Sequence, residues 1–538
     1  MKLPRIQPWI AGLAALALWV ALAAWVHLQI AGPPRARAVT IRLAHWQNEV
    51  GPADGLNDVI KRYEELNPHV RVKQMVIPPS IYRQWLRTNF VGENSADIVE
   101  YGAWLQGMSD IPVRYFAPIT AQLQEPNPYN RGTSLEGVPW LKTFSDELLE
   151  QRLNSPEPGQ YYAVTQARGS FRLFSNRQLL REVTGSDRVP TTLIELRAVA
   201  ERLSAYGQAR QRPIALFAGS KDTATLLMGM YLMGTTSRLV PELDRDGLLS
   251  LSAPHVLGGY LQGKWDFQRP AMLAGLTLVG EFSAQMKPGF QQLSRDEAMR
   301  EFLHGDALFI FAQSGAARTL HDQASFDVDA LRAPQPTRDD PVVGPYILGP
   351  FADGNDMTSF GFYLNKRSPL KAEAIDFMRF LASQEGNALF SAQSGWPPSI
   401  RGVPMSPEVA AFVSPADGYM LGISYFSAGG NSRDLLPRNL YRLTGPQGSP
   451  AKLAAALDEQ MPEAARADLA ALTRDAWLAT LPQDARIAAL GGLVHARPDQ
   501  PAHGLARERL EAAQNQSEAR ALMFARQLQS AGTNGRER

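Results

Sequence analysis

Apolar and polar positions recur along most of the chain, in some stretches with a period of two and in others with a period near 3.6, which predicts strands interspersed with helices. Val39, Ile41 and Leu43 alternate with more polar neighbours and predict a first strand that ends at residues 45–48. Further strands are expected over 69–77, 96–100, 161–168, 171–176, 308–312 and 357–364, and helices over 55–65, 82–90 and 371–386. This order predicts an α/β fold.

The N-terminal residues do not follow this pattern. Residues 6–34 contain no Asp, Glu, Lys or Arg, and their apolar centre matches the roughly 20 residues that cross a bilayer. Ala36-Arg37-Ala38 has the small-x-small form of a signal-peptidase site, so a cleaved secretion signal is one interpretation. The apolar stretch is longer than an ordinary signal core and carries Trp at both ends, which favours a retained membrane anchor, a transmembrane helix, within residues 1–38.

The C-terminal residues change character again. From Pro450 onward, Ala and Leu recur at helical spacing among Arg, Glu and Gln, and Gly491-Gly492 followed by a Pro-containing interval separates two such stretches. We therefore expect a helical extension over 446–538. It is either a surface helix with a frayed tail or a docking element for another protein of the cell envelope.

Composition narrows the classes of function. A chain of 538 residues should form at least two domains. Lys and Arg total 54 against 53 Asp and Glu, with no long block of either sign, so we expect no nucleic acid partner. Since cysteine is absent, structural disulfides, thiolate zinc sites and thiol nucleophiles are excluded.

Matches to catalytic motifs are short and incomplete. Residues 258–264 have the spacing of a phosphate-binding loop, but Trp265 stands where a Ser or Thr is required. Ser368 to Lys371 imitate a Ser-x-x-Lys nucleophile motif without its companion Lys-Thr-Gly, and neither His-Glu-x-x-His nor Gly-x-Ser-x-Gly occurs. Whether two acidic residues are placed to cleave glycosides is not decided by the sequence, because the distance between their carboxyl groups is set by the fold. We therefore expect that the chain is not an enzyme and that it has no catalytic residue, no cofactor and no metal site.

Six segments follow the first strand in a fixed order, and with it they cover Val39 to Arg401. They are RYEELNPHVRV, SADIVEYGAWL, YYAVTQARGSFRLFSNRQLL, FLHGDALFIF, SFGFYLNKRSPLKAEAIDFMRFLASQEG and SGWPPSIRGV. This series resembles the family-one extracellular solute-binding proteins, the group that includes maltose-binding protein and other sugar-capturing subunits of ATP-driven importers. The resemblance implies a two-lobed, type II periplasmic-binding-protein-like fold with a hinge between the lobes.

The resemblance also implies a division of the chain and a role. Lobe 1 is expected over 39–164 and 318–382, and lobe 2 over 165–317 and 383–445. Gly169-Ser170 would then be a crossing between the lobes, although the residues alone fit an ordinary turn equally well. The implied role is to capture a sugar by hinge closure and deliver it to the transmembrane permease subunits of an ABC importer, at the periplasmic face of the cytoplasmic membrane. A membrane-anchored sensory or scaffold protein with the same fold is the alternative.

Residues that follow predicted strands are the candidates for the ligand site, because ligands of open α/β sheets bind outside the carboxyl ends of the strands. A sugar offers a C–H face to an aromatic ring, and its hydroxyl groups need amides, acids and Arg. The candidates are Trp46, Gln47, Asn48, Glu49, Tyr101, Trp104, Arg168, Ser170, Phe171, Trp265, Gln313, Ser314, Ser359, Gly361 and Trp396. Of these, Trp265 is chosen from the loop-like GKWDF, and Trp396 because its segment resembles a late loop of the family. Large aromatic residues are more often core than ligand platform, and Trp396 fits packing as well as it fits binding.

The chain departs from the family at one place in this set. The family usually has an aromatic residue after the strand at 308–312, whereas Ser314 to Ala317 offer none. One expected stacking surface is therefore missing, and a particular sugar cannot be carried over from the family.

Overall fold

The computed structural model describes residues 19–20, 39–47, 50–102, 111–149, 151, 155, 159–244, 247, 251–350, 357–413, 419, 422–423 and 429–534. In these ranges we find no helix with both the length and the apolar character that a bilayer span requires. The anchor predicted over 6–34 falls outside them except for residues 19 and 20, so it stays a prediction.

The first of two sheets has five strands. They are β1 (Val39–His45), β2 (Val70–Val76), β3 (Ile98–Glu100), β4 (Ala163–Gly169) and β9 (Met357–Leu364), in the order β2-β1-β3-β9-β4. β1 is parallel to β2 and β3, and β9 is antiparallel to both β3 and β4. The strands expected from the alternating pattern are confirmed, since alternate residues of each strand point into a core.

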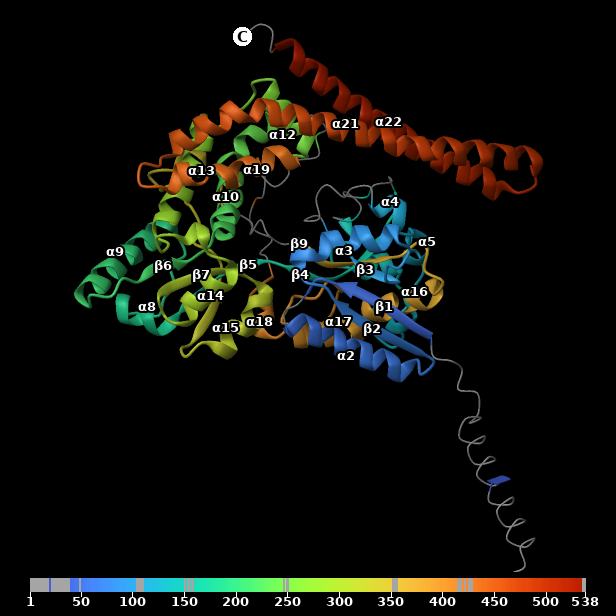
Figure 1. Cartoon of the computed structure of the whole chain (residues 1–538), viewed down its shortest axis with the longest axis horizontal. Helices are drawn as coiled ribbons and strands as arrows, with labels where there is room; N and C mark the ends of the chain where they lie inside the picture. The colour runs from blue at the N-terminus through green and yellow to red at the C-terminus, as the bar shows by residue number, and fades with distance from the viewer. Residues whose placement is uncertain are drawn as a thin grey trace, which may run out of the picture.

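The second sheet has four strands and a separate core. Its strands are β5 (Phe171–Asn176), β6 (Ala215–Ala218), β7 (Ala307–Gln313) and β8 (Val328–Leu331), in the order β6-β7-β5-β8. Buried side chains such as Leu173 and Phe309 belong to this core, whereas Leu43 and Phe362 belong to that of the first sheet. We call each sheet with its covering helices a lobe, and Figure 1 shows the first and second lobes beside each other.

Helices cover both lobes. Those of the first lobe are α2 (Val50–Leu66), α3 (Pro79–Val91), α4 (Ile111–Tyr115), α5 (Thr120–Leu123), α6 (Trp140–Thr143), α16 (Lys371–Leu381) and α17 (Gln384–Ser394). Those of the second lobe are α8 (Arg177–Thr184), α9 (Leu193–Ala209), α10 (Lys221–Thr235), α11 (Val240–Leu243), α12 (Ala253–Leu261), α13 (Pro270–Ala284), α14 (Arg295–Leu303), α15 (Ala317–Gln323), α18 (Pro407–Ala410), α19 (Gly430–Asn439) and α20 (Tyr441–Thr444). Short 3₁₀ turns are Pro128–Asn130, Ser237–Leu239, Phe290–Gln292, Ser314–Ala316 and Gly344–Tyr346.

One element in each of two expected ranges lies in the opposite lobe to the one that the sequence predicted. The range 318–382 was expected in the first lobe, but its strand β8 hydrogen-bonds to the edge of β5 in the second sheet. The range 383–445 was expected in the second lobe, but its helix α17 packs against α2 of the first lobe. Gly51 and Gly55 permit that contact, because a Cβ at Gly55 would lie 3.0 Å from the Phe390 carbonyl oxygen of α17.

The apolar stripe predicted as one helix over 371–386 is divided into two. α16 ends at Leu381, and α17 begins at Gln384 with the Ser383 hydroxyl accepting from the Gly386 N–H. A Cβ at Gly386 would lie 2.1 Å from the Phe380 carbonyl oxygen. The sharp turn between the helices therefore requires glycine at this position.

Gly386→Ala should consequently lower the free energy of unfolding by about 1–3 kcal/mol, since the added methyl must displace main-chain atoms. Urea denaturation measures this change. Gly492→Ala is the matched control, because Gly492 is helical and a Cβ there meets no atom within 4 Å. The control should be neutral or up to about 1 kcal/mol more stable, and equal effects of the two substitutions would contradict the interpretation.

The C-terminal residues form the expected helical extension. α21 (Pro450–Ala496) packs on α12, α13, α19 and α20, and α22 (Pro501–Asn534) packs along α21. The expected separation into two helices is found in the Pro-containing interval, at 497–500, whereas α21 continues through Gly491-Gly492 to Ala496. The Asp468 carboxylate of α21 is nearly fully buried and accepts four hydrogen bonds from the first turn of α19. We call α21 and α22 together the C-terminal hairpin (Figure 1).

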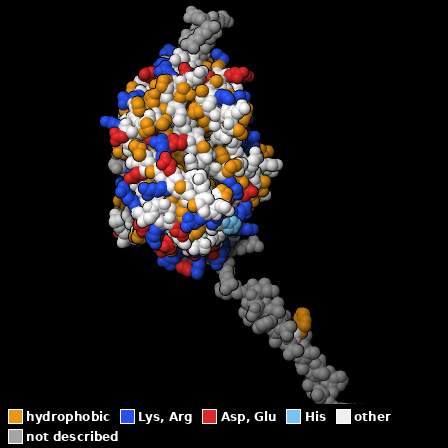
Figure 2. All heavy atoms as spheres, turned by 90° about the vertical axis from the view of Figure 1, so that its left-hand side faces the viewer, with side chains coloured by type: hydrophobic (Ala, Val, Ile, Leu, Met, Phe, Trp, Pro, Cys, Tyr) orange, Lys and Arg blue, Asp and Glu red, His pale blue; other side chains and the backbone are white. Residues whose placement is uncertain are grey.

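Charges of both signs intermingle on the surface of the second lobe. Figure 2 shows Lys and Arg interspersed with Asp and Glu over this face, with hydrophobic side chains between them. A field of one sign, as a nucleic acid would require, is not seen on this face.

Candidate functional site

The carboxyl ends of strands from both sheets meet where the chain passes between the lobes. β3 and β4 are both antiparallel to β9, so β1, β3 and β4 run the same way and end at His45, Glu100 and Gly169. Only Ser170 separates Gly169 from β5, and the first residue of β5 pairs with Gln313 at the end of antiparallel β7. Residues that follow these strands therefore lie at the edges through which the two sheets approach each other.

Trp46 and Gln47 are joined to the end of β3. The Glu100 carboxylate accepts from the Gln47 amide (Nε2–Oε1 2.7 Å) and from the Trp46 main-chain N–H (3.2 Å). Glu100 is fully buried, whereas Trp46 and Gln47 are half-buried and present part of their surface to solvent. The carboxylate thus fixes the turn after β1, from which an aromatic ring and an amide project.

Two aromatic residues of α3 support that turn. The Trp46 ring stands edge-on to the Tyr82 ring, with centroids 5.1 Å apart, and the Tyr82 ring stacks on Trp85 at 5.8 Å. The Tyr82 hydroxyl donates to the Glu100 carbonyl oxygen (2.7 Å). Because Tyr82 is buried and Trp85 half-buried, this cluster has an internal anchor and an outer aromatic surface.

Burial shifts the pKa values of two titratable groups here in opposite directions. It raises the pKa of Glu100 to about 8, although the bonds from Gln47 and Trp46 oppose the rise. It lowers the pKa of His45 to about 4, opposed by the bond to the Gln74 amide oxygen (2.6 Å). A low-dielectric environment disfavours the charged form of both groups. Neither His45 nor Glu100 was among the residues expected from the sequence.

The remaining polar candidates surround the crossing between the lobes. Arg168 donates its main-chain N–H to the Pro397 carbonyl oxygen (2.8 Å) and its guanidinium to the Ser145 hydroxyl (3.2 Å). Gln313 and Ser359 are half-buried. Ser170 is buried and donates to the Phe412 carbonyl oxygen, and the main-chain N–H of buried Ser314 donates to the Ser170 carbonyl oxygen (3.0 Å).

Five further candidates pack inside the lobes. The Trp265 ring is 2% exposed, stands edge-on to Tyr260 and Phe267, and donates its N–H to the Val256 carbonyl oxygen (2.8 Å). Trp396 is 4% exposed and packs on Phe360. The other buried candidates are Tyr101, Phe171 and Gly361. The expectation that the Trp265 and Trp396 rings cover a ligand is corrected to a packing role in this structure, because each ring lies in an apolar core.

Three expected residues, Asn48, Glu49 and Trp104, lie outside the residues that the structure describes. They adjoin the described ends of β1 and β3, and they remain predictions.

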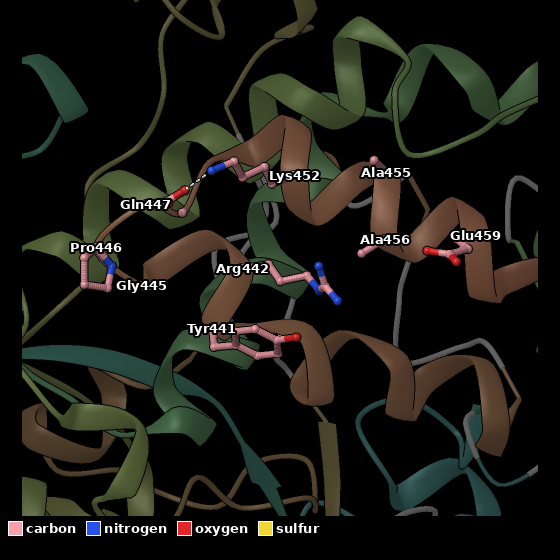
Figure 3. Close-up of a pocket in the computed structure, with 10 residues that line it drawn as sticks. Tyr441, Arg442, Gly445, Pro446, Gln447, Lys452, Ala455, Ala456 and Glu459 are labelled. Atoms are coloured by element: carbon pink, nitrogen blue, oxygen red, sulfur yellow. Dashed lines mark hydrogen bonds between the residues drawn. The ribbon is translucent and has the colours of Figure 1, made fainter.

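A hollow lies elsewhere, beside α20 and the start of α21 (Figure 3). Its volume is about 710 Å³, it is open to solvent, and it is lined by residues that include Tyr441, Arg442, Lys452 and Glu459. Lys452 donates to the Gln447 carbonyl oxygen (2.7 Å) across its rim. None of the residues expected at the ligand site lines it. The hollow therefore belongs to the base of the C-terminal hairpin.

Metal ligation receives no support from the described part of the chain. There, no three His, Asp or Glu side chains are grouped as a metal ion would require.

Comparison with known proteins agrees with this geometry. Residues 58–413 match the sequence profile described as "Bacterial extracellular solute-binding protein". A search of curated proteins finds no match.

Solved structures with the same fold include a chitin oligosaccharide binding protein (19% identity, TM-score 0.56) and a maltose-bound MalE3 of T. maritima (15%, 0.55). RafE in complex with raffinose is another (15%, 0.53). The alignments cover 80%, 79% and 79% of this chain, and 99%, 99% and 100% of the respective structures.

Proposed function

Because the chain belongs to the bacterial extracellular solute-binding proteins, we propose that it captures a sugar or oligosaccharide between its two lobes and delivers it to the permease of an ABC importer. The observation that carries this proposal is the meeting of strand ends from both sheets at the Gly169-Ser170 crossing. A ligand held there can contact both lobes at once.

The side chains at these edges support a carbohydrate as the ligand class. Trp46 and Trp85 supply aromatic surface for the C–H face of a sugar ring, and Gln47, Arg168 and Gln313 supply donors and acceptors for its hydroxyl groups. The structures with the same fold are named for binding chitin oligosaccharides, maltose and raffinose. Which of these sugars this chain prefers is open to the test below.

Capture would use a rotation of the lobes about their connections. The chain passes between the sheets three times. The first crossing is at 169–171, the second falls between Ile347 of the second core and Met357 of β9, and the third follows Val403 of the first core. Ligand contacts to both lobes favour the closed arrangement, and only a difference in affinity between open and closed states can move that equilibrium. No bond of the ligand is made or broken.

The proposed location is the outer face of the cytoplasmic membrane. The predicted apolar segment 6–34 would tether the chain there. A tether raises the effective concentration of the loaded protein near the permease.

Titration calorimetry of residues 39–538 with maltose, raffinose, chitobiose and xylobiose tests the proposal, and we expect saturable binding of at least one. Trp46→Ala should weaken that binding about tenfold, since a lost ring contact costs about 1 kcal/mol or more. Trp477→Ala is the matched control, because Trp477 lies on the C-terminal hairpin and is 41% exposed. If none of the four sugars binds, the carbohydrate proposal in this form is wrong.

A sensory or scaffold role is a second candidate, favoured by the C-terminal hairpin. The hairpin, at 450–534, lies outside the family match at 58–413. A sensor predicts that a strain lacking the chain still imports the sugar but no longer responds to it, whereas the importer role predicts loss of uptake.

A further inference from the structure

The contact between Gln47 and Glu100 has a consequence for which ligand groups the site accepts. An amide carries an acceptor on one side and a donor on the other, so the atom that faces Glu100 decides which atom faces away. In the structure Gln47 Nε2 donates to Glu100 Oε1, and among the described residues no donor reaches Gln47 Oε1. Oε1 is thus available to a ligand hydroxyl.

We propose that Glu100 is a specificity-determining residue that, by gaining or losing a proton, sets whether Gln47 presents an acceptor or a donor to the ligand. This inference rests on the proposed function and concerns the same site. When Glu100 is ionised, both carboxylate oxygens accept, one from the Gln47 amide and one from the Trp46 N–H. The outward atom of Gln47 is then its oxygen.

Protonation of Glu100 favours the opposite orientation of the Gln47 side-chain amide. A proton from solvent on Glu100 Oε1 must be donated to an acceptor, and the nearest is the Gln47 oxygen after a half-turn of the amide. The other carboxyl oxygen, Oε2, keeps the bond from the Trp46 N–H. The Gln47 NH₂ group then faces outward as a donor, so no heavy atom needs to move beyond the exchange of two amide positions.

The surroundings of Glu100 allow both forms. The side chain is fully buried, and its described neighbours hold no cation that would keep it ionised. The titratable groups that face it among the described residues are Tyr82 of α3, whose hydroxyl donates to the Glu100 main-chain carbonyl, and His45 of β1, whose Nδ1 accepts from the Gln47 main-chain N–H. From β9, the residue paired with Glu100 is the apolar Phe362.

Burial raises the pKa of Glu100 to about 8, so the change of form falls in an accessible range. The same shift determines how the contribution of Glu100 to folding stability changes with pH. Between about 4.5 and 8 the folded chain holds the proton that the unfolded chain releases, so this group's contribution to stability is complete below 4.5 and declines as the pH rises to 8.

The first test needs no sugar. In ¹⁵N-labelled protein, assigned with the variant Gln47→Ala, the side-chain NH₂ resonances of Gln47 should shift between pH 6 and 9.5 with a midpoint near 8. In Glu100→Gln they should be constant, because the introduced amide can donate to Gln47 Oε1 and accept from the Trp46 N–H at every pH. Constant resonances in the native chain, or an equal shift in the variant, would overturn the proposal.

The second test uses the tightest-binding of maltose, raffinose, chitobiose and xylobiose. Its Kd in the native chain should change at least about fivefold between pH 6 and 9.5, as one mismatched buried hydrogen bond predicts. Glu100→Gln should keep the low-pH value throughout. If that variant does not fold, Gln47→Ala must lose the pH dependence while Glu100 remains. A Kd that is constant in the native chain, or that changes equally in Gln47→Ala, contradicts the proposal. If none of the four sugars binds, the proposed function fails, and the resonance titration still decides the inference.

Discussion

Asp468→Ala is expected to lower the free energy of unfolding by about 3–5 kcal/mol, because it removes four hydrogen bonds to a buried carboxylate and leaves their neutral donors without an acceptor. The Asp468 carboxylate is 4% exposed and accepts from the main-chain N–H groups of Asn431 (3.0 Å) and Ser432 (2.8 Å). It also accepts from the Asn431 amide (2.8 Å) and the Ser432 hydroxyl (2.7 Å). All four donors lose their partner in the variant, so the start of α19 should separate from α21.

Urea denaturation and hydrogen exchange of α19 measure this effect. Asp434→Asn is the matched control, because Asp434 is an exposed acid on α19 whose contact with Arg438 is a surface i,i+4 pair. Such pairs are worth about 0.3–0.5 kcal/mol. A loss below about 1 kcal/mol in Asp468→Ala would mean that the hairpin is held by apolar packing alone.

Arg172→Ala is expected to have an effect of similar size, about 3 kcal/mol or more, because it removes three hydrogen bonds from a buried guanidinium and leaves one buried and two partly buried carbonyl groups without this donor. The Arg172 side chain is 2% exposed and donates to the carbonyl oxygens of Ala411 (2.7 Å), Phe171 (2.9 Å) and Val413 (3.1 Å). It therefore ties the start of β5, just after the first crossing between the lobes, to the segment that follows the third crossing.

The change is measured by thermal and urea unfolding, and small-angle scattering then reports whether the arrangement of the lobes has changed. Arg181→Ala on the surface of the second lobe is the control, since the Arg181 side chain is 62% exposed and its contact with Asp187 is a surface pair. Arg172→Lys should recover part of the loss, because an ammonium can reach one or two of the carbonyls but cannot reproduce the planar fork. Equal stability of Arg172→Ala and Arg181→Ala would show that the tie is dispensable.

The strands were the part of the fold that sequence patterns predicted best. Alternation such as that of Val39, Ile41 and Leu43 directly reports which face of a strand is buried. The lobe to which β8 and α17 belong could not be read in this way, because it depends on pairing with β5 and on contact with Gly51 and Gly55 of α2. Those contacts join residues more than 100 positions apart.

The candidate site was predictable to a similar degree. Position after a strand led to Trp46 and Gln47, which lie at the edge of the first sheet. A loop-like sequence pointed to Trp265, and the resemblance to the family pointed to Trp396. Both lie in cores, because a tryptophan in a loop can equally turn inward. Glu100 was not predicted, because it is the last residue of a short apolar strand. Nothing in the neighbouring sequence indicates that the Gln47 amide, which follows a different strand, will donate to its carboxylate.

The hairpin can act as a lever. α21 is held by α12, α13, α19 and α20 of the second lobe, and from Asp468 to its end at Ala496 it continues for about 42 Å at 1.5 Å per residue. A turn of the second lobe by about 15°, a size seen in rigid-body transitions, about an axis perpendicular to α21 would displace the far end of this arm by about 11 Å relative to Asp468. A pair of spin labels, one near Ala496 and one on the first lobe, would therefore magnify the opening and shutting of the molecule into an easily resolved change of distance.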